Sequence, residues 1–200
     1  YSLGTTVQKA LHGSDYDEAY ATIRTNDNAH VVTGYASRSG KWYDLYLAKL
    51  DSAGTEIWSK NYGGTSGDYG NDVAQCADSG FVVVGETNSF GAGGKDVYLI
   101  RTDKNGNALW SKSYGGAATD IGHAVQETTD GGFIITGETN SFGGIGYDIY
   151  LIRTDENGDT VWTRTFGDYN SDVGYDVKQT VDGGFIIAGK AYQSSGGWNA

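Results

Sequence analysis

Acidic and amide side chains alternate in two short segments of the sequence at spacings that could supply oxygen ligands to Ca²⁺. These segments are Asp103–Asn107 and Asp155–Asp159. Calcium loops use alternating Asp and Asn oxygens, but they place glycine at the sixth position and close with a glutamate at the twelfth. Here glycine stands fourth, no glutamate closes either segment, and the corresponding segment Asp51–Thr55 lacks most of the oxygens. The pattern therefore favours a polar hairpin turn.

A second set of acidic residues is spaced evenly along the chain. Asp17, Asp68, Asp120 and Asp172 occupy one position of a repeating unit, where we expect them to accept hydrogen bonds from turn amides. Calcium bound near the unit boundaries stays open as an alternative, since Asp72 and Asp176 also lie there. We otherwise expect no cofactor and assign no metal ligand.

The residue types that act as nucleophiles, bases and acids form no catalytic pattern. His12, His30 and His123 fall at unrelated positions of the unit, without the spacing of a metal site or triad. Glu86 and Glu138 recur one unit apart, so their pairing follows from repetition alone. The single cysteine stands where sister units carry threonine, which favours a structural role. We assign no catalytic residue and favour a protein that is not an enzyme.

The elements that hold these side chains belong to a unit of about 52 residues. Three tryptophans, Trp58, Trp110 and Trp162, are each 52 residues apart, and their repetition favours packing between neighbouring units over ligand stacking. The sequence pattern of each unit predicts four short strands, which in the third unit span 123–128, 133–136, 148–153 and 160–166. The second strand is apolar throughout, which indicates burial on both faces. Asn157-Gly158 predicts a type I′ hairpin turn.

Four strands and a period near 50 residues predict an all-β chain with the blades of a β-propeller. A β-solenoid is the alternative, but its coils are usually shorter. We expect one propeller domain or propeller fragment over 1–200, with three full blades and partial blades at both ends. The expected blades are 1–14 (a fourth strand, aligned at 5–12), 15–67, 68–119, 120–171 and 172–200. The missing strands of the last unit predict a longer propeller or association between copies.

The composition of the chain excludes some classes of partner as expectations. The chain carries 25 Asp and Glu against 14 Lys and Arg, a net charge of −11 that repels phosphate backbones, so we expect no nucleic acid. No apolar run approaches 18 residues, so no membrane-spanning helix is expected. The 32 glycines and 15 tyrosines suit short strands joined by tight turns.

The chain resembles the repeats of secreted or surface β-propeller proteins of bacteria and archaea in two segments, DGGFIITGETNSFG and DIYLIRTDENGDTVW. The resemblance implies an extracellular or cell-surface location and says little about activity. A more distant resemblance to quinoprotein-like propellers rests on Asp103, Gly106 and Trp110 and on their repeats. Its spacing differs by one residue and no quinone-binding residue matches, so no cofactor is implied.

Loop lengths predict where function lies. The two longer connections of each blade share one face, and loops held by a rigid scaffold commonly carry binding residues. The aromatic residues expected to bind there are Trp42, Tyr43, Phe90, Phe142, Tyr147 and Trp198. For Phe90 and Phe142, packing under their own loops stays open as an alternative. We expect a non-enzymatic binding or assembly module for a protein or glycan, able to self-associate through open blade edges. The alternatives are a lectin-like propeller and a fragment of a quinoprotein-like or polysaccharide-cleaving enzyme.

Overall fold

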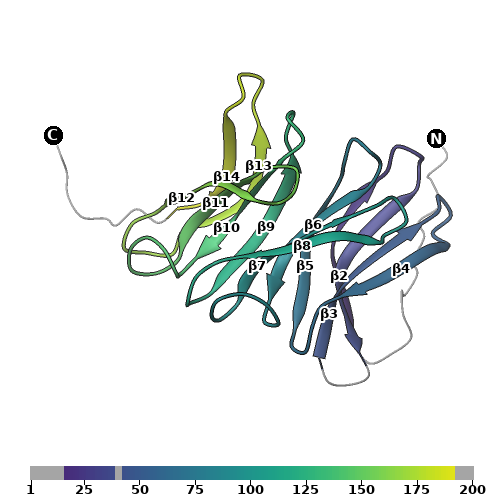
Figure 1. Ribbon diagram of the computed structural model, residues 1–200, viewed down its shortest axis with the longest axis horizontal. Helices are drawn as coiled ribbons and strands as arrows, with labels where there is room; N and C mark the ends of the chain where they lie inside the picture. Colours follow the sequence, from purple (N-terminus) through teal and green to yellow (C-terminus); the bar gives the residue numbers. More distant parts are fainter. Residues whose placement is uncertain (1–15, 39–41, 192–200) are drawn as a thin grey trace, which may run out of the picture.

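The computed structural model describes residues 16–38 and 42–191, which form antiparallel β-strands and no helix (Figure 1). The strands make three four-stranded sheets and one two-stranded sheet, each in simple sequential order. The first sheet contains β1 (Asp17–Arg24), β2 (His30–Arg38), β3 (Trp42–Leu50) and β4 (Glu56–Tyr62), and the second contains β5 (Asp68–Gln75), β6 (Phe81–Thr87), β7 (Asp96–Thr102) and β8 (Ala108–Tyr114). The third sheet contains β9 (Asp120–Glu127), β10 (Phe133–Thr139), β11 (Asp148–Thr154) and β12 (Thr160–Phe166). The fourth contains β13 (Val173–Gln179) and β14 (Phe185–Lys190).

The expected strands of the third unit all form, with β12 at the predicted bounds and the others slightly longer. Extended pairing explains the added residues, because Thr139 pairs with both Asp120 and Asp148 at the strand ends. The strand expected at 5–12 lies outside the described residues. The all-β, four-stranded architecture is therefore confirmed for the described chain.

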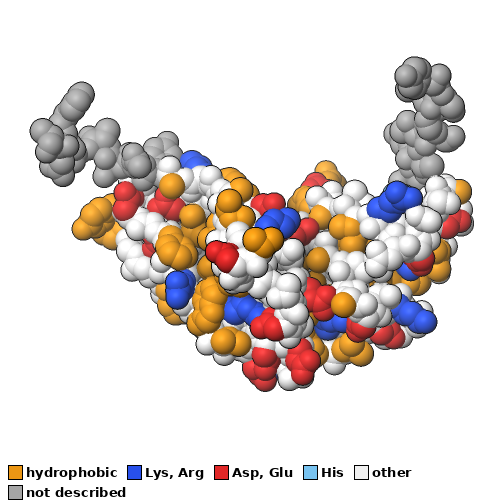
Figure 2. Space-filling view, turned by 90° about the horizontal axis from the view of Figure 1, so that it is seen from above, with side chains coloured by type: hydrophobic (Ala, Val, Ile, Leu, Met, Phe, Trp, Pro, Cys, Tyr) orange, Lys and Arg blue, Asp and Glu red, His pale blue; other side chains and the backbone are white. Residues whose placement is uncertain are grey.

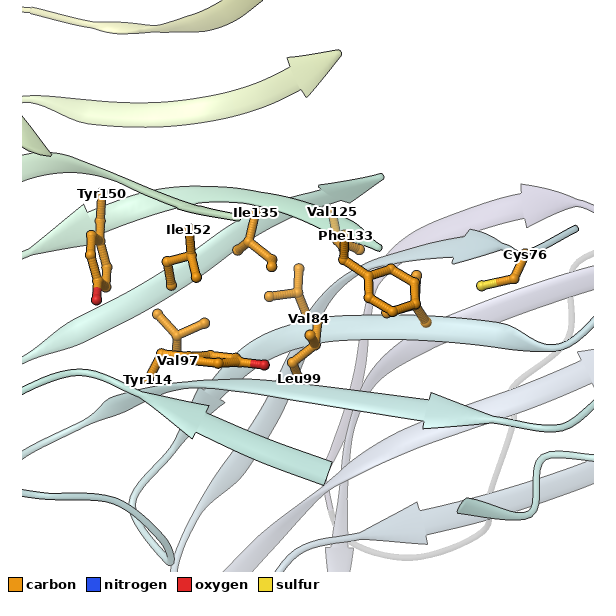
Figure 3. Packing of buried hydrophobic residues seen from close by; sticks show 11 residues of the cluster. Cys76, Val84, Val97, Leu99, Tyr114, Val125, Phe133, Ile135, Tyr150 and Ile152 are labelled. Atoms are coloured by element: carbon orange, nitrogen blue, oxygen red, sulfur yellow. The ribbon is translucent and has the colours of Figure 1, made fainter. Parts of the chain in front are cut away.

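Each sheet packs face to face against the next, and the apolar second strands supply both contacts. Phe81 and Val83 of β6 face the preceding sheet, where they join Leu45 and Leu47. Val84, on the opposite face of β6, lies with Val97 and Leu99 against Phe133 and Ile135 of the following sheet (Figure 3). Side chains alternate between the faces of a strand, so a strand between two sheets must be apolar throughout.

The three repeated tryptophans lie at these junctions. The rings of Trp58, Trp110 and Trp162 lie 5.9, 5.7 and 5.9 Å from the rings of Phe81, Phe133 and Phe185, respectively. Each tryptophan thus joins the fourth strand of one sheet to the second strand of the next. Aromatic pairs in this range of separations are favourable beyond the area they bury.

A repeated hydrogen bond also joins neighbouring sheets. The side-chain oxygens of Gln75, Glu127 and Gln179 each accept from a backbone N–H in the first turn of the preceding sheet. The donors are Asn26, Ala77 and Thr129, at 2.9, 2.7 and 2.9 Å. These bonds fix the position of one sheet relative to the next, which apolar contact alone would not do.

The stacked sheets form an open arc. The first strands β1, β5, β9 and β13 contact one another in succession, whereas the fourth strands make no comparably close succession. The space-filling view shows the resulting curvature, with one hollowed and one bulging edge (Figure 2). Within the described residues the arc does not close on itself (Figure 1).

The hairpin turns differ from the expected type I′ geometry. In the turn 155–158 only Gly158 has a positive φ, at 77°, and Asn157 does not. A type I′ turn requires positive φ at both central residues. The observed turn instead begins with Asp155, whose Oδ1 accepts from the backbone N–H of Asn157 and Asp159 at 2.9 and 2.8 Å. The aspartate satisfies the turn amides, so the prediction of type I′ was wrong.

Ser79 is a residue at which local backbone strain is expected. Its φ is +71°, while the equivalent residue of the next unit, Gly131, has a φ of +85°. A left-handed conformation costs a residue with a Cβ about 1–2 kcal/mol. We expect Ser79→Gly to raise the free energy of unfolding by about 0.5–1 kcal/mol, after allowing for the flexibility of glycine in the unfolded chain. Urea denaturation measures the change. Gly131→Ser should lower the same quantity, and equal signs for the two variants would contradict the explanation.

Candidate functional site

Tyr43 on β3, one of the aromatic residues expected to bind a partner, lies in a group of tyrosines that does not include the other expected residues. Four tyrosines from β1, β2, β3 and β5 meet at the junction of the first two sheets. The ring of Tyr35 lies 5.7 Å from that of Tyr20, 4.8 Å from that of Tyr43 and 5.1 Å from that of Tyr69. Tyr20 is half exposed and Tyr35 is nearly buried. We call this group the tyrosine cluster.

Charged side chains surround the tyrosine cluster. Lys95 lies with its Nζ 5.9 Å from the centre of the Tyr69 ring and 2.6 Å from Glu86 Oε1. On the other side, burial and a hydrogen bond to Glu18 raise the pKa of Tyr20 well above its usual value. The Tyr20 hydroxyl therefore stays protonated at neutral pH. The cluster offers a ring face together with hydroxyl donors and carboxylate acceptors.

The tyrosine rings are too close together to form an open aromatic cage for a cation. Such cages hold a cation over ring faces, within about 6 Å of each centroid. Here the rings contact one another edge to face, and Lys95 already lies over the ring of Tyr69. A flat ligand stacked on Tyr20 fits this arrangement better than an enclosed cation.

Phe90 and Phe142, also expected at the site, pack instead on their own sheets. Their rings lie 5.6 Å from those of Tyr98 and Tyr150, respectively. Each also lies close to the connection from the preceding sheet: a Cβ on Gly64 would be 3.0 Å from Phe90. Because both phenylalanines repeat the same contacts, the geometry indicates a role in packing.

The remaining expected site residues do not join the tyrosine cluster. Trp42 is exposed, and its side chain is on the opposite face of β3 from that of Tyr43, because successive side chains alternate. Tyr147 lies in the equivalent loop of the third sheet, where its backbone oxygen accepts from Asp172 N–H at 2.6 Å. Trp198 lies outside the described residues.

The repeated aspartates at the sheet junctions are buried. Asp68, Asp120 and Asp172 accept from the backbone N–H of Gly64, Gly116 and Asp168 at 2.9, 2.8 and 3.1 Å, respectively. Asp68 and Asp120 also accept from Ser89 and Ser141 hydroxyls. The carboxylates thus stabilise the connections between sheets. In residues 16–38 and 42–191, no three His, Cys, Asp or Glu side chains are grouped so as to hold a metal ion.

His123 lies near two polar side chains at the junction of the third and fourth sheets. Its Nε2 is 3.8 Å from Glu138 Oε1, and its ring is 6.0 Å from that of Tyr175. Tyr20, Asn71 and Tyr175 occupy the same repeat position in the other sheets. This position therefore varies while the surrounding strands stay alike.

Cys76 lies just after β5 within the apolar cluster between the second and third sheets (Figure 3). Burial raises the pKa of its thiol to about 12. A thiol with this pKa is protonated at neutral pH and is a poor nucleophile.

An ion pair at the turn between β1 and β2 supplies a prediction about acid sensitivity. Lys49 Nζ lies 2.7 Å from Asp27 Oδ2, and this contact lowers the pKa of Asp27 to about 2. An aspartate in an unfolded chain has a pKa of about 3.9. The contribution of the ion pair to the free energy of unfolding is therefore complete above that pH and is lost as the pH falls toward 2. When thermal unfolding is measured at several pH values, the melting temperature should fall less steeply below about pH 4 for Asp27→Asn than for the wild type. Parallel declines would contradict this assignment.

Sequence reasoning missed Tyr20 and Tyr35. Tyr35 stands where the later units carry Glu86, Glu138 and Lys190. The available signal was this departure from the repeat, because a residue that packing requires recurs in every unit. The contacts between sheets, which bring Tyr20, Tyr35 and Tyr69 together, were not visible in the sequence.

The fold and the junctions define an all-β chain of repeated four-stranded antiparallel sheets. The chain is 27% identical over 214 residues to Regulatory protein FlaEY of Caulobacter vibrioides (strain ATCC 19089 / CIP 103742 / CB 15). That match covers 92% of this chain and 22% of the relative, so the chain spans less than a quarter of the relative's length. No protein-family model matches the chain.

A solved structure resembles the fold at low sequence identity. It is a protein of unknown function from Bacteroides caccae, similar with a TM-score of 0.53 and 10% identity over 88% of this chain and 54% of that one. At this identity the likeness concerns the fold alone. Across the described ranges, no helix is long and apolar enough to cross a membrane.

Proposed function

We propose that the chain is part of a β-propeller and serves as a non-enzymatic binding and assembly module outside the cell or on its surface. The face-to-face packing of four-stranded sheets and the mutual contact of their first strands support a propeller. The acidic surface and the resemblance to secreted repeat proteins support the location. Assembly occurs at the last sheet, β13–β14.

One observation carries the proposal: in the part of the chain that the structure describes, no further sheet covers the face of β14 that points away from the third sheet. Ile186 is 63% exposed, whereas Val82 and Ile134 at the same repeat position are fully buried. Ala188 is likewise exposed, and its counterpart Val84 is buried by the next sheet. An exposed apolar face of this kind marks an interaction surface. Another sheet of the same kind is the partner that the other junctions accommodate, and a second copy of the chain is one source of it.

Size-exclusion chromatography with light scattering tests self-association through this face. We expect the wild-type mass to rise with concentration and Ile186→Asp to remain a monomer. Leu109→Asp is the matched control, because Leu109 is 58% exposed and lies on β8 of the second sheet, not on the last sheet. A wild-type chain that stays monomeric at all concentrations, or equal effects of the two variants, would refute self-association.

Carbohydrate binding is the second candidate function, and the tyrosine cluster supports it. Sugar rings stack on exposed aromatic faces while their hydroxyls bond to nearby carboxylates and amines. Tyr20 supplies such a face, and Glu18, Glu86 and Lys95 supply polar groups beside the cluster. A glycan array should give ligands whose affinity falls with Tyr20→Ala but not with Tyr16→Ala, which removes another exposed tyrosine. No binding, or equal losses, would count against this function.

A further inference from the structure

Each of the four first strands carries a β-bulge at the same repeat position. The pairing of first and second strands skips Tyr20 in β1, Asn71 in β5, His123 in β9 and Tyr175 in β13. A bulge bends its strand and re-aims the side chain of the extra residue, and bulges are common beside functional sites. The Asn71 side chain reaches the next first strand, where its Nδ2 donates to the Gly122 carbonyl at 2.9 Å. The bulges therefore present side chains of differing type along the contacts between first strands.

A glycine on each second strand makes room for the bulge. A Cβ on Gly85 would lie 1.8 Å from the Tyr69 carbonyl oxygen, and a Cβ on Gly137 would lie 1.8 Å from that of Ile121. Glycine within a strand commonly marks such a close approach of two backbones. The bulges are thus built into the repeat, and only the side chains that they carry change from sheet to sheet.

The second sheet shows how a primary ammonium group binds beside its bulge. Lys95 Nζ lies 2.6 Å from Glu86 Oε1 and 5.9 Å from the centre of the Tyr69 ring. The carboxylate accepts a charge-assisted hydrogen bond, and the ring supplies a cation–π contact. The Glu86 side chain is 12% exposed, so the lysine neutralises a carboxylate that is largely removed from water.

The third sheet keeps this carboxylate and loses the lysine. Glu138 stands one unit after Glu86, and Tyr147 stands one unit after Lys95. The Glu138 side chain is 18% exposed, and its Oε1 lies 3.8 Å from His123 Nε2, which is longer than a hydrogen bond. An imidazole is charged only when it is protonated, so His123 does not replace the charge that a lysine carries at neutral pH. Glu138 can therefore accept from an ammonium group that the chain supplies only in the second sheet.

An aromatic ring lies next to this carboxylate and imidazole. The ring of Tyr175, the bulge residue of the fourth sheet, lies 6.0 Å from that of His123. Tyr175 is 55% exposed. Tyr20, at the same repeat position, is 51% exposed although a four-stranded sheet follows its own, so this position is open at a complete junction as well. We call Glu138, His123 and Tyr175 the bulge site.

We propose that the bulge site binds the primary ammonium group of an amino sugar. The ammonium donates to Glu138, as Lys95 does to Glu86, while the sugar ring lies against Tyr175 and a ring hydroxyl bonds to His123. The net charge of −11 and the carboxylate at the site favour this class over uronates and sulfated sugars, which are anionic. The proposal rests on the glycan-binding function proposed above and names the class of glycan.

Isothermal titration of the full chain with a glucosamine hexasaccharide is the direct test. The N-acetylglucosamine hexasaccharide is the matched ligand, because acetylation removes the positive charge and keeps the sugar rings. We expect the acetylated ligand to bind about tenfold more weakly, since it loses a charge-assisted hydrogen bond. Glu138→Gln should weaken glucosamine binding by about tenfold and change binding of the acetylated ligand by less than about twofold.

Glu156→Gln is the matched control variant. Glu156 is exposed in the turn between β11 and β12, at the opposite end of the third sheet from Glu138. The two variants remove the same charge, so general attraction of a polycation to an acidic protein affects both alike. Equal losses for Glu138→Gln and Glu156→Gln would overturn the proposal.

Tyr147→Lys tests the precedent from the second sheet. It places a lysine at the repeat position of Lys95, from which its ammonium can reach Glu138 and occupy the site. We expect this variant to weaken glucosamine binding by about tenfold or more without lowering the melting temperature, whereas Tyr147→Phe should bind as the wild type does. Unchanged binding by Tyr147→Lys would contradict the assignment of Glu138 as the ammonium acceptor.

The outcomes separate the bulge site from glycan binding itself. Array ligands that depend on Tyr20, together with a glucosamine hexasaccharide that does not bind or ignores Glu138→Gln, would refute the bulge site and leave glycan binding standing. Glucosamine binding through Glu138 without any Tyr20-dependent ligand would refute the tyrosine cluster and support the bulge site. If Nα-acetyl-lysine amide displaced the hexasaccharide at equal ammonium concentration, the ammonium would come from a protein lysine, which would overturn the assignment to an amino sugar.

Discussion

Ile134→Ala should lower the free energy of unfolding by about 2–5 kcal/mol, whereas Ile186→Ala should change it by less than about 0.5 kcal/mol. The two isoleucines occupy one repeat position, on the same face of the second strand in consecutive sheets. Ile134 is fully buried in the cluster with Leu151 and Val177, and its truncation leaves a cavity there. Ile186 is 63% exposed, so its truncation removes little buried area.

Urea denaturation of both variants at low protein concentration measures this difference, because dilution keeps assembly from contributing. The same pair measured at high concentration tests assembly: Ile186→Ala should then lose the concentration dependence seen in the wild type. If Ile186→Ala destabilised the monomer as much as Ile134→Ala, the face of β14 would be covered within the chain, and the proposed assembly surface would not exist.

Gly158→Ala should lower the free energy of unfolding by about 2–5 kcal/mol, and Gly131→Ala by only about 1 kcal/mol. Both glycines have positive φ, 77° and 85°, so both substitutions carry the backbone cost. The added Cβ meets nothing within 4 Å at Gly131 but would lie 2.8 Å from the Trp110 ring at Gly158. The difference between the variants therefore measures the seating of the turn on the tryptophan.

The test is denaturation of both variants together with Gly158→Ala in a Trp110→Phe background. A smaller ring leaves more room, so the cost of the alanine should fall toward that at Gly131. Equal losses for Gly158→Ala and Gly131→Ala would show that the turn does not press on the indole.

The strands were predictable because their signals are local. The apolar second strands, the glycine-marked turns and the 52-residue period led to the correct number of strands in each full sheet. The turn type was not predictable from Asn157-Gly158, because the Asp155 carboxylate bonds the turn amides and selects a conformation with positive φ only at Gly158. The hydrogen bonds of an aspartate three residues before the glycine thus outweigh the preference of the Asn-Gly dipeptide for a type I′ turn.

The candidate site was predicted less well. Tyr43 belongs to the tyrosine cluster, but Phe90 and Phe142 pack on their own sheets. Loop length predicted the face that carries them but could not say which aromatic rings contact a tyrosine of their own sheet. Tyr20 and Tyr35 lie on β1 and β2, so the lengths of the loops carry no signal for them.

The sequence by itself determined the repeat, the all-β class and the order of strands within each sheet, because periodicity and turn residues act over short stretches of chain. The tertiary structure alone decided which residues of different units meet: the tyrosine cluster, the hydrogen bonds of Gln75, Glu127 and Gln179, and the difference between Trp110 and Trp162. Trp110 and Trp162 have the same place in the repeat, but within residues 16–38 and 42–191 a turn covers only Trp110. The two tryptophans differ because they have different packing neighbours, and the repeated sequence pattern alone does not say which segment packs beside which sheet.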